Sequence, residues 1–437
     1  MTTSIKESGH DLGRGWIILA MMVIFMMINF GDKAVLGLSA GYIMKDLHLT
    51  HAQFGEVGST FFLLFSVSAI VVGVAVDRFS TKAVLALMAL IWAATQMPMV
   101  GAVSLETFVV TRIGLGAGEG PAFPVALHSV YKWFPHDRRA VPTSFVSIGA
   151  PLGIAILSPL LTWIIVHYSW HAAFGFLGII GFVWLAVWLA VGREGPLGAH
   201  RIEAGAEGLD RVSYAALLTS RTFIGVTLAG FAAYWALAVA IVWLPSFLGK
   251  VGGYSPTAIG WIVVLPPLLQ IVLSPAIGAY SQNLRTRGVS SRIAGGLFTS
   301  GSVLVAGIAM MLLSRTSGGF ETISLAMIAF AVCAVTWAIG PTLIGEISPV
   351  HQRGAALGIS NGLFSTAGLI APWLMGHIVD VGANPVQGFK NAFLYAGLLI
   401  VAGSAVAMAL IHPERDIERF KNGVALDKRE GLPTLRS

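Results

Sequence analysis

The sequence predicts an all-α membrane protein whose twelve transmembrane helices form two pseudo-symmetric six-helix bundles. Three observations carry this prediction: the composition, the length of the apolar segments and a weak internal repeat. The 437 residues are 56% apolar and only 11% charged, whereas soluble domains are about 45–50% apolar and about 25% charged. This composition excludes a soluble globular enzyme, a disordered chain and a nucleic-acid-binding domain.

Twelve apolar segments are long enough to cross the membrane, since about 20 helical residues span roughly 30 Å of hydrocarbon. In chain order they are 16–43, 53–76, 83–102, 105–131, 140–167, 172–192, 222–249, 257–282, 292–314, 321–346, 354–379 and 391–411. Helices are expected because lipid offers no partner to unpaired backbone groups. The polar residues 1–15 and the long apolar run after them do not fit a secretory signal, so a first membrane helix is expected here.

Basic residues in the loops predict the orientation of the helices. If the N-terminus is cytoplasmic, 21 of the 27 Lys and Arg residues fall in cytoplasmic segments and 4 fall on the other side. The remaining two, Lys33 and Arg112, lie inside spans. This distribution also explains the net charge of +6 without nucleic acid. We expect a multi-pass membrane protein with both termini in the cytoplasm.

Reporter fusions test this topology. Because residues 206 and 437 follow segments rich in cations, fusions at both positions should report the cytoplasm. A periplasmic signal at either position would overturn the predicted orientation.

Two short patterns from the first half of the chain recur in the second half at nearly the same spacing, which suggests a duplication. Ala173-Phe174 with Gly178 recurs as Ala392-Phe393 with Gly397, and Pro135 with Arg139 recurs as Pro349 with Arg353. We therefore predict bundles at 1–192 and 222–412, a cytoplasmic linker at 193–221 and a cytoplasmic tail at 413–437. Transporters built from such repeats bind substrate near the midplane.

Ionisable residues inside the spans are candidates for a functional site, because burying a charge in lipid is expensive. Asn29, Asp32 and Lys33 share one face of the first span, and Arg112 and Glu119 share one face of the fourth. The rise per residue places Asp32 and Arg112 at a similar depth and Glu119 about two turns nearer the cytoplasm. Two interpretations are open: an anion site with proton-coupling acids, or structural salt bridges between these acids and bases.

The loop after the second span carries Gly73, Asp77, Arg78 and Lys82, in a pattern that resembles the cytoplasmic signature of the major facilitator superfamily. The glycine would permit close helix contact, and the charges would latch the cytoplasmic side. Ser80 stands where the superfamily usually has a second glycine. The alternative is an ordinary basic cytoplasmic loop.

Four motifs resemble those of the anion:cation symporter family within this superfamily. They are Asp32-Lys33-Ala-x-Leu, Arg112-x6-Glu119-x-Pro121-x2-Pro124, Phe134-Pro135 with Arg138 and Arg139, and Trp243-Leu244-Pro245-x2-Leu248. The resemblance implies a major facilitator fold and proton-coupled import of a small organic anion by alternating access. That anion would be a sugar acid, a dicarboxylate or an aromatic acid. The resemblance also implies that Arg112 holds the substrate carboxylate and that Asp32 and Glu119 carry the proton.

Some positions depart from the family pattern. Lys33 replaces the usual arginine, Phe30 and Phe65 replace tyrosines, and Ala150 replaces an amide. Because fewer hydroxyl groups then line the site, a polyhydroxylated sugar acid is less strongly predicted as the substrate, and a smaller or more apolar acid is more strongly predicted. In the second half the resemblance places further substrate contacts at Thr336, Trp337, Ser360 and Asn361. Asn361 could instead be a polar residue that packs helices together. Glu346 with Arg353 resembles a second cytoplasmic latch.

The alternative function is an efflux antiporter of the same superfamily that exports an organic metabolite or drug. Such antiporters usually carry Gly-Pro-x-x-Gly-Gly in the fifth helix, and residues 149–154 do not match it. A membrane-embedded hydrolase would need paired acids or His-Glu-x-x-His, and neither occurs. The glycines of 114–120 favour helix packing over nucleotide binding. We expect no enzymatic activity, cofactor, metal site or nucleic-acid partner; the expected partners are the organic anion, protons and the bilayer.

Overall fold

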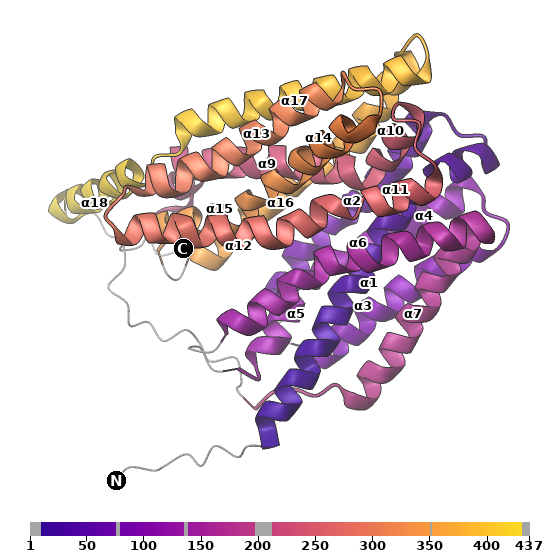
Figure 1. Ribbon diagram of the computed structural model, residues 1–437. Coiled ribbons are helices and arrows are strands. Elements are labelled where there is room, and N and C mark those ends of the chain that lie inside the picture. The colour runs from indigo at the N-terminus through magenta and orange to yellow at the C-terminus, as the bar shows by residue number, and fades with distance from the viewer. Residues whose placement is uncertain (1–9, 76–78, 135–138, 197–211, 350–351, 431–437) are drawn as a thin grey trace. The chain divides into compact units, whose positions relative to one another are not determined.

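The computed structural model describes residues 10–75, 79–134, 139–196, 212–349 and 352–430, and within these ranges the chain is helical (Figure 1). Of the predicted cytoplasmic signature, Asp77 and Arg78 lie outside the described residues, whereas Gly73 lies in α2 (His51–Ala75). The chain forms two compact units. Among the described residues, the first unit takes in 10–48, 60–196 and 256–264, and the second takes in 49–59, 212–255 and 265–430.

The first unit contains the long helices of the first half of the chain. They are α1 (His10–Asp46), most of α2, α3 (Thr81–Gln96) with a 3-10 turn at Met97–Val100, α4 (Leu105–Glu119), α5 (Ala122–Tyr131), α6 (Ala140–His167) and α7 (Trp170–Val191), joined by α11 (Pro256–Ile262). Side chains of Ser80, Ser104 and Ser169 cap the starts of α3, α4 and α7. α1 packs on α6, and α3 packs on α7 (Figure 1).

Glycines bring α4 against α2, as the packing interpretation predicts. A Cβ at Gly116 would lie 1.8 Å from the carbonyl oxygen of Phe61, and one at Gly120 would lie 2.0 Å from that of Phe65. Helix backbones can approach this closely only where no side chain intervenes. The predicted fourth span is interrupted directly after Gly120, where Pro121 precedes α5.

The second unit contains most of the second half of the chain. Its helices are α8 (Tyr214–Leu218), α9 (Arg221–Val242), α10 (Leu244–Lys250), α12 (Leu265–Thr286), a π-helical turn at Arg292–Leu297 that continues into α13 (Phe298–Leu313), α14 (Gly319–Ala331), α15 (Val335–Ile347) after a 3-10 turn at Val332–Ala334, α16 (Arg353–Val381), α17 (Pro385–Leu410) and α18 (Pro413–Glu430). α9 packs on α16 and α17, and α13 packs on α17 (Figure 1).

The start of α2 packs within the second unit, on α16. Asp380 accepts hydrogen bonds from His51 Nδ1 at 2.8 Å and from the backbone N–H of Ala52 at 2.7 Å. Ser59 accepts one from the N–H of Trp373 at 3.0 Å. The units therefore do not follow the predicted boundaries residue for residue, and the division into bundles at 1–192 and 222–412 stays a prediction.

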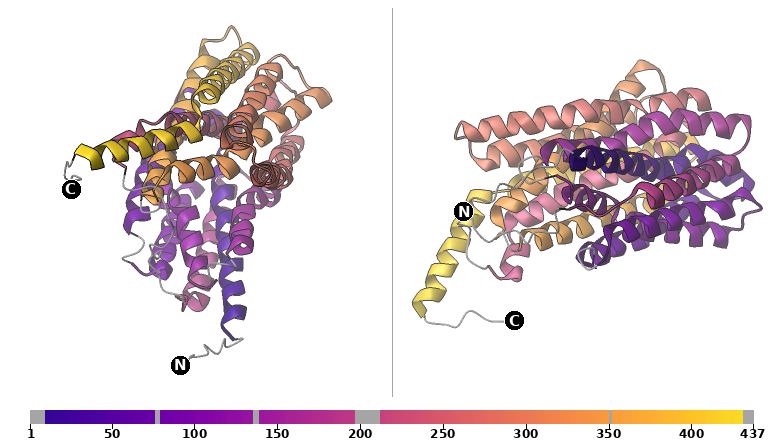
Figure 2. Two further views of the ribbon diagram at one scale, coloured as in Figure 1. Left: turned by 90° about the vertical axis from the view of Figure 1, so that its left-hand side faces the viewer. Right: turned by 90° about the horizontal axis from the view of Figure 1, so that it is seen from below.

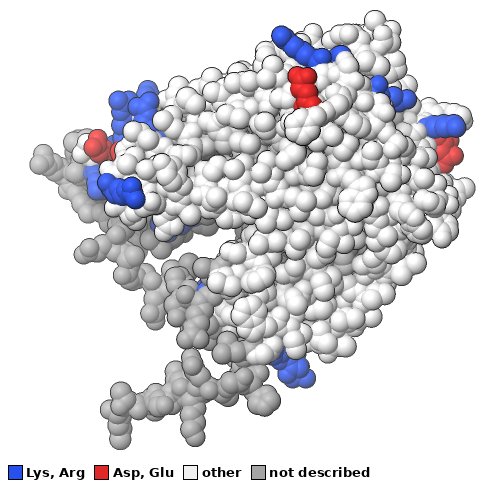
Figure 3. All heavy atoms as spheres, in the orientation of Figure 1, with Lys and Arg blue, Asp and Glu red and all other residues white. Residues whose placement is uncertain are grey.

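Ten helices within the described ranges are long and apolar enough to cross a membrane. α2 and the interrupted α4–α5 pair are not among these ten, although each predicted span coincides with helical residues. On the face drawn in Figure 3, charged side chains gather near the ends of the helices and leave an uncharged surface between them. The chain is thus a multi-pass helical membrane protein, and the count of twelve spans stays a prediction.

The predicted tail contains a helix that the sequence analysis did not anticipate. α18 follows α17 and extends away from the ends of the other helices of the second unit (Figure 2). Asp416 in its first turn accepts a hydrogen bond from the N–H of Thr222 at 2.8 Å, which ties α18 to α9. A short polar helix after the last apolar run gives no signal in a search for membrane spans.

Candidate functional site

The first unit holds a network of buried charges between α1, α3 and α4. α1 contributes Asp32 and Lys33, and α4 contributes Arg112 and Glu119. Lys33 is 8% exposed, and the other three are 1% exposed each. Charges withdrawn this far from water are retained only where they are paired or used in function. The structure thus brings together the four charged residues that the sequence singled out.

Lys33 and Glu119 form a buried ion pair through Nζ and Oε2. The same ammonium donates to Asn29 Oδ1 at 2.6 Å. Three phenylalanines surround it: its Nζ lies 4.8 Å from the ring centroid of Phe30, 5.5 Å from that of Phe61 and 5.7 Å from that of Phe65. Aromatic faces attract an ammonium, so the three rings add to the contacts that hold Lys33 in place.

Arg112 and Asp32 are connected through an uncharged residue, Gln96 of α3. Arg112 Nη2 donates to Gln96 Oε1 at 3.0 Å, and Gln96 Nε2 donates to Asp32 Oδ1 at 2.8 Å. The guanidinium also lies 5.7 Å from the ring centroid of Phe108 and 5.1 Å from that of Phe174. Gln96 is not among the residues predicted from the sequence, although an amide within an apolar span is a signal that could have identified it.

Three buried atoms of this network have no hydrogen-bond partner among the described residues: Arg112 Nε, Glu119 Oε1 and Asn29 Nδ2. Buried polar atoms are nearly always satisfied, so each such atom calls for an explanation. The two open donors, Arg112 Nε and Asn29 Nδ2, lie in a network with two cations and suit a carboxylate, whereas the open oxygen of Glu119 suits a proton or a hydroxyl donor. The arrangement can bind an anion and can exchange a proton at either carboxyl group.

The structure shows one of the pairings between acids and bases that the sequence left open, a direct salt bridge between Lys33 and Glu119. Both interpretations of this pair, structural and functional, stay predictions. The ammonium of Lys33 is directed at Glu119 of α4, although Asp32 is its neighbour in the sequence. Within the described ranges, Asp32 forms no ion pair within 4.0 Å and is held by the amide of Gln96.

The four substrate contacts predicted in the second half of the chain do not form one connected network among the described residues; each has its own neighbours. The ring centroid of Trp337 in α15 lies 6.0 Å from that of Tyr234 and 5.0 Å from that of Phe364. Thr336 donates to the carbonyl of Thr299 at 3.3 Å. Ser360 is 2.9 Å from the hydroxyl of Thr227, and Asn361 is exposed on α16. Their role in substrate binding stays a prediction.

At one end of the first unit, the carboxylate of Glu194 accepts hydrogen bonds from three donors. It accepts from Ser80 Oγ at 2.9 Å, from the N–H of Lys82 at 2.8 Å and from Lys132 Nζ at 2.7 Å. The ammonium of Lys82 itself donates to the carbonyl of Leu189 at 2.8 Å. Lys82 was predicted from the sequence, whereas Glu194, which follows α7 and accepts the hydrogen bond from the backbone of Lys82, was not.

Burial raises the pKa of Glu194, but the hydrogen bonds from Lys132, Lys82 and Ser80 outweigh burial and lower it overall. A carboxyl whose folded pKa is lowered stabilises the fold above its unfolded pKa, and this contribution is lost as the pH falls through the folded value. Glu194→Gln should therefore lower the melting temperature at neutral pH. The difference from the parent should shrink below about pH 4. Glu418→Gln, at an exposed acid of α18, should change little; a pH-independent difference for Glu194→Gln would contradict the assignment.

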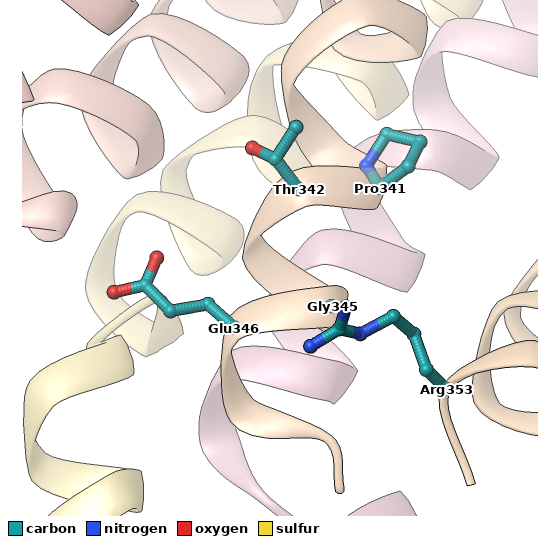
Figure 4. Close-up of a pocket in the computed structure, with 5 residues that line it drawn as sticks. All are labelled: Pro341, Thr342, Gly345, Glu346 and Arg353. Atoms are coloured by element: carbon teal, nitrogen blue, oxygen red, sulfur yellow. The ribbon is translucent and has the colours of Figure 1, made fainter. Parts of the chain in front are cut away.

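The second unit also has a cluster of charged residues, and in it Glu346 bonds residues other than the partner predicted for the cytoplasmic latch. Glu346 accepts from Arg285 Nη1 at 3.2 Å and from Ser291 Oγ at 2.7 Å. Its expected partner Arg353 forms no ion pair with it within the described residues. Instead, Arg353 and Glu346 line a cavity of about 440 Å³ together with Pro341, Thr342 and Gly345 (Figure 4).

Membrane-spanning helices with an ion pair buried among them are typical of a solute transporter. The model of the Major Facilitator Superfamily matches residues 21–327 and 226–435, and the chain belongs to this family. This confirms the predicted transporter, as opposed to an enzyme.

Individual relatives resemble the chain over most of its length. A hexuronate transporter of Bacillus subtilis (strain 168) is 29% identical over 409 residues, which cover 91% of this chain and 94% of the relative. A probable sulfoacetate transporter of Cupriavidus necator is 27% identical over 415 residues, with coverage of 91% and 94%. A bacterial homolog of the human lysosomal transporter Spinster has a TM-score of 0.75 at 16% identity, covering 93% and 98%. The resemblance to anion transporters of this superfamily is thereby confirmed.

Proposed function

We propose that this protein imports a small organic carboxylate together with protons, by alternating access. The observation that carries the proposal is the buried network of the first unit, in which two cations lie beside polar atoms that the described residues leave open. The relatives support the substrate class, because hexuronate and sulfoacetate both carry a carboxylate. We place the protein in the bacterial inner membrane as a monomer with cytoplasmic termini.

In this mechanism Arg112 is the main carboxylate contact. Its Nη2 is engaged by Gln96, whereas its Nε is buried without a partner in the described part of the chain. A guanidinium presents its donors as a planar fork, so the open side of Arg112 suits a carboxylate oxygen. Lys33 supplies the second positive charge once its bond to Glu119 is weakened.

Protons enter through the two acids. Protonation of Glu119 removes the charge that holds Lys33 and makes the ammonium available to the incoming anion. Protonation of Asp32 removes the negative end of the Asp32–Gln96–Arg112 chain and leaves the charge of Arg112 for the substrate. Binding of proton and anion thus favour each other, which is the linkage that symport requires.

The surroundings of the network favour an acid with an apolar body. Phe30, Phe61 and Phe65 surround the ammonium, and Phe108 and Phe174 flank the guanidinium. A site that selects a polyhydroxylated acid needs hydrogen-bonding side chains for its hydroxyls. We therefore rank aromatic and small aliphatic acids above sugar acids as substrates.

Counterflow in proteoliposomes tests the proposal. Vesicles loaded with one unlabelled acid should accumulate the same labelled acid without any ion gradient, and an imposed inward proton gradient should drive net uptake. The panel should include benzoate, tartrate, sulfoacetate and galacturonate. Counterflow that does not respond to the proton gradient would contradict the proposed proton coupling. The absence of counterflow with every acid of the panel would contradict the proposed substrate class.

A further inference from the structure

Two arginines at equivalent positions of the internal repeat are used differently. Arg139, at the start of α6, donates to the carbonyl of Phe134 at 3.0 Å and to that of Tyr131 at 3.1 Å. Arg353, its counterpart at the start of α16, forms no hydrogen bond or ion pair with any residue in the described ranges. A guanidinium that retains all its donors beside a cavity is available to a ligand.

The acid in the same cavity does not compensate Arg353. Glu346 precedes Arg353 by the same interval as Lys132 precedes Arg139, so the repeat carries an acid here in place of a base. Lys132 is neutralised by Glu194, and Glu346 is neutralised by Arg285 at 3.2 Å. Ser291 donates to the other oxygen of Glu346. The positive charge of Arg353 is therefore in excess.

The cavity is an open depression whose volume is comparable to that of small-molecule sites. Its volume of about 440 Å³ lies within the usual range of roughly 300–1,000 Å³ for ligand pockets. Gly345 lies next to the arginine side chain: a Cβ there would be in ordinary van der Waals contact, 3.4 Å from Cδ and Nε of Arg353. Figure 4 shows the guanidinium lying beside Gly345 while the carboxylate of Glu346 points away from it. Thr342 lines the cavity from the same helix, and its hydroxyl donates to the carbonyl of Ile339 at 2.7 Å.

We propose that this cavity is a second anion-binding site, distinct from the network around Arg112, which takes an oxyanion through the fork of Arg353. A carboxylate or a phosphate group fits, because both accept two parallel N–H bonds from a guanidinium. The occupant is the transported acid, in which case the site rests on the proposed function, or a phosphate group, free or on a lipid.

Thiol labelling measures the charge of this cavity directly. The full-length Thr342→Cys, Cys333→Ser protein in zwitterionic nanodiscs is reacted with an anionic and with a cationic methanethiosulfonate reagent. Adding Arg353→Gln should lower the ratio of anionic to cationic labelling rates by about threefold or more, since one charge acts oppositely on the two reagents. Arg287→Gln, an exposed cation after α12, should leave the ratio unchanged. An equal ratio with and without Arg353 would overturn the proposal.

Protection from labelling then identifies the occupant. Benzoate and galacturonate, inorganic phosphate, and nanodiscs with anionic lipid are each tested. Slower labelling with an acid assigns the site to the transported anion, and slower labelling only with phosphate or anionic lipid assigns it to a phosphate group. In either case Arg353→Gln should abolish protection; protection by none of them would overturn the site. Because labelling needs no transport, a chain that moves no acid would refute the proposed function and leave this test intact.

Discussion

Arg112→Ala is expected to abolish both binding and transport of the organic acid. Removing one partner of a buried charge contact costs about 2–5 kcal/mol, which corresponds to a loss of affinity of about 30-fold to several thousand-fold. Direct binding of labelled acid to the purified protein measures this loss. Arg112→Lys should recover only part of the affinity, because an ammonium keeps the charge and lacks the planar fork.

The structure defines the controls for this experiment. Arg112 is tied to Gln96 and packs between two phenylalanine rings, so its removal also perturbs the first unit. Thermal unfolding must show that Arg112→Ala remains folded. Arg315→Ala removes an exposed cation beyond α13 and should bind like the parent. Unchanged affinity in a folded Arg112→Ala protein would place the carboxylate contact elsewhere.

The elements that the sequence predicted well are those governed by composition and local spacing. Long apolar runs coincide with helices, and Asp32 with Lys33 and Arg112 with Glu119 lie on the faces that helical periodicity assigned to them. The cost of charge in lipid marked these residues without any knowledge of their neighbours. Such signals reside in a single helix and can be recognised before the helices are packed.

Contacts between helices could not be predicted in the same way. The rotation of α1 against α4 decides that Lys33 bonds Glu119 rather than its neighbour Asp32, and no sequence spacing encodes that rotation. Gln96 joins the network from a third helix, and because it is uncharged, the cost of burying a charge in lipid does not mark it in the sequence. Glu346 bonds Arg285 of α12 although Arg353 is nearer in sequence, because the packing of α12 on α15 decides which cation is within reach.

Glu119→Gln is expected to uncouple transport from the proton gradient while preserving substrate exchange. Glutamine is uncharged and still presents an oxygen to Lys33, so it resembles the protonated acid. The variant should bind the acid at least as tightly as the parent and perform counterflow at a comparable rate. It should lose the accumulation that an inward proton gradient drives, because no proton leaves this position during the cycle. Uptake under an imposed gradient and counterflow without one separate the two effects.

Asp32→Asn tests the second acid, which is held by Gln96 and not by a cation of the described residues. An asparagine keeps an acceptor for Gln96 and removes the charge that acts on Arg112 through the amide. Accumulation should again be lost, or the cycle should stop altogether if the charge of Asp32 is needed to release the substrate. Glu321→Gln, at an exposed acid of α14, is the matched control and should accumulate substrate normally. If Glu119→Gln and Asp32→Asn both concentrate the acid as well as the parent does, both carboxyl groups are structural and the proton is not carried by this network.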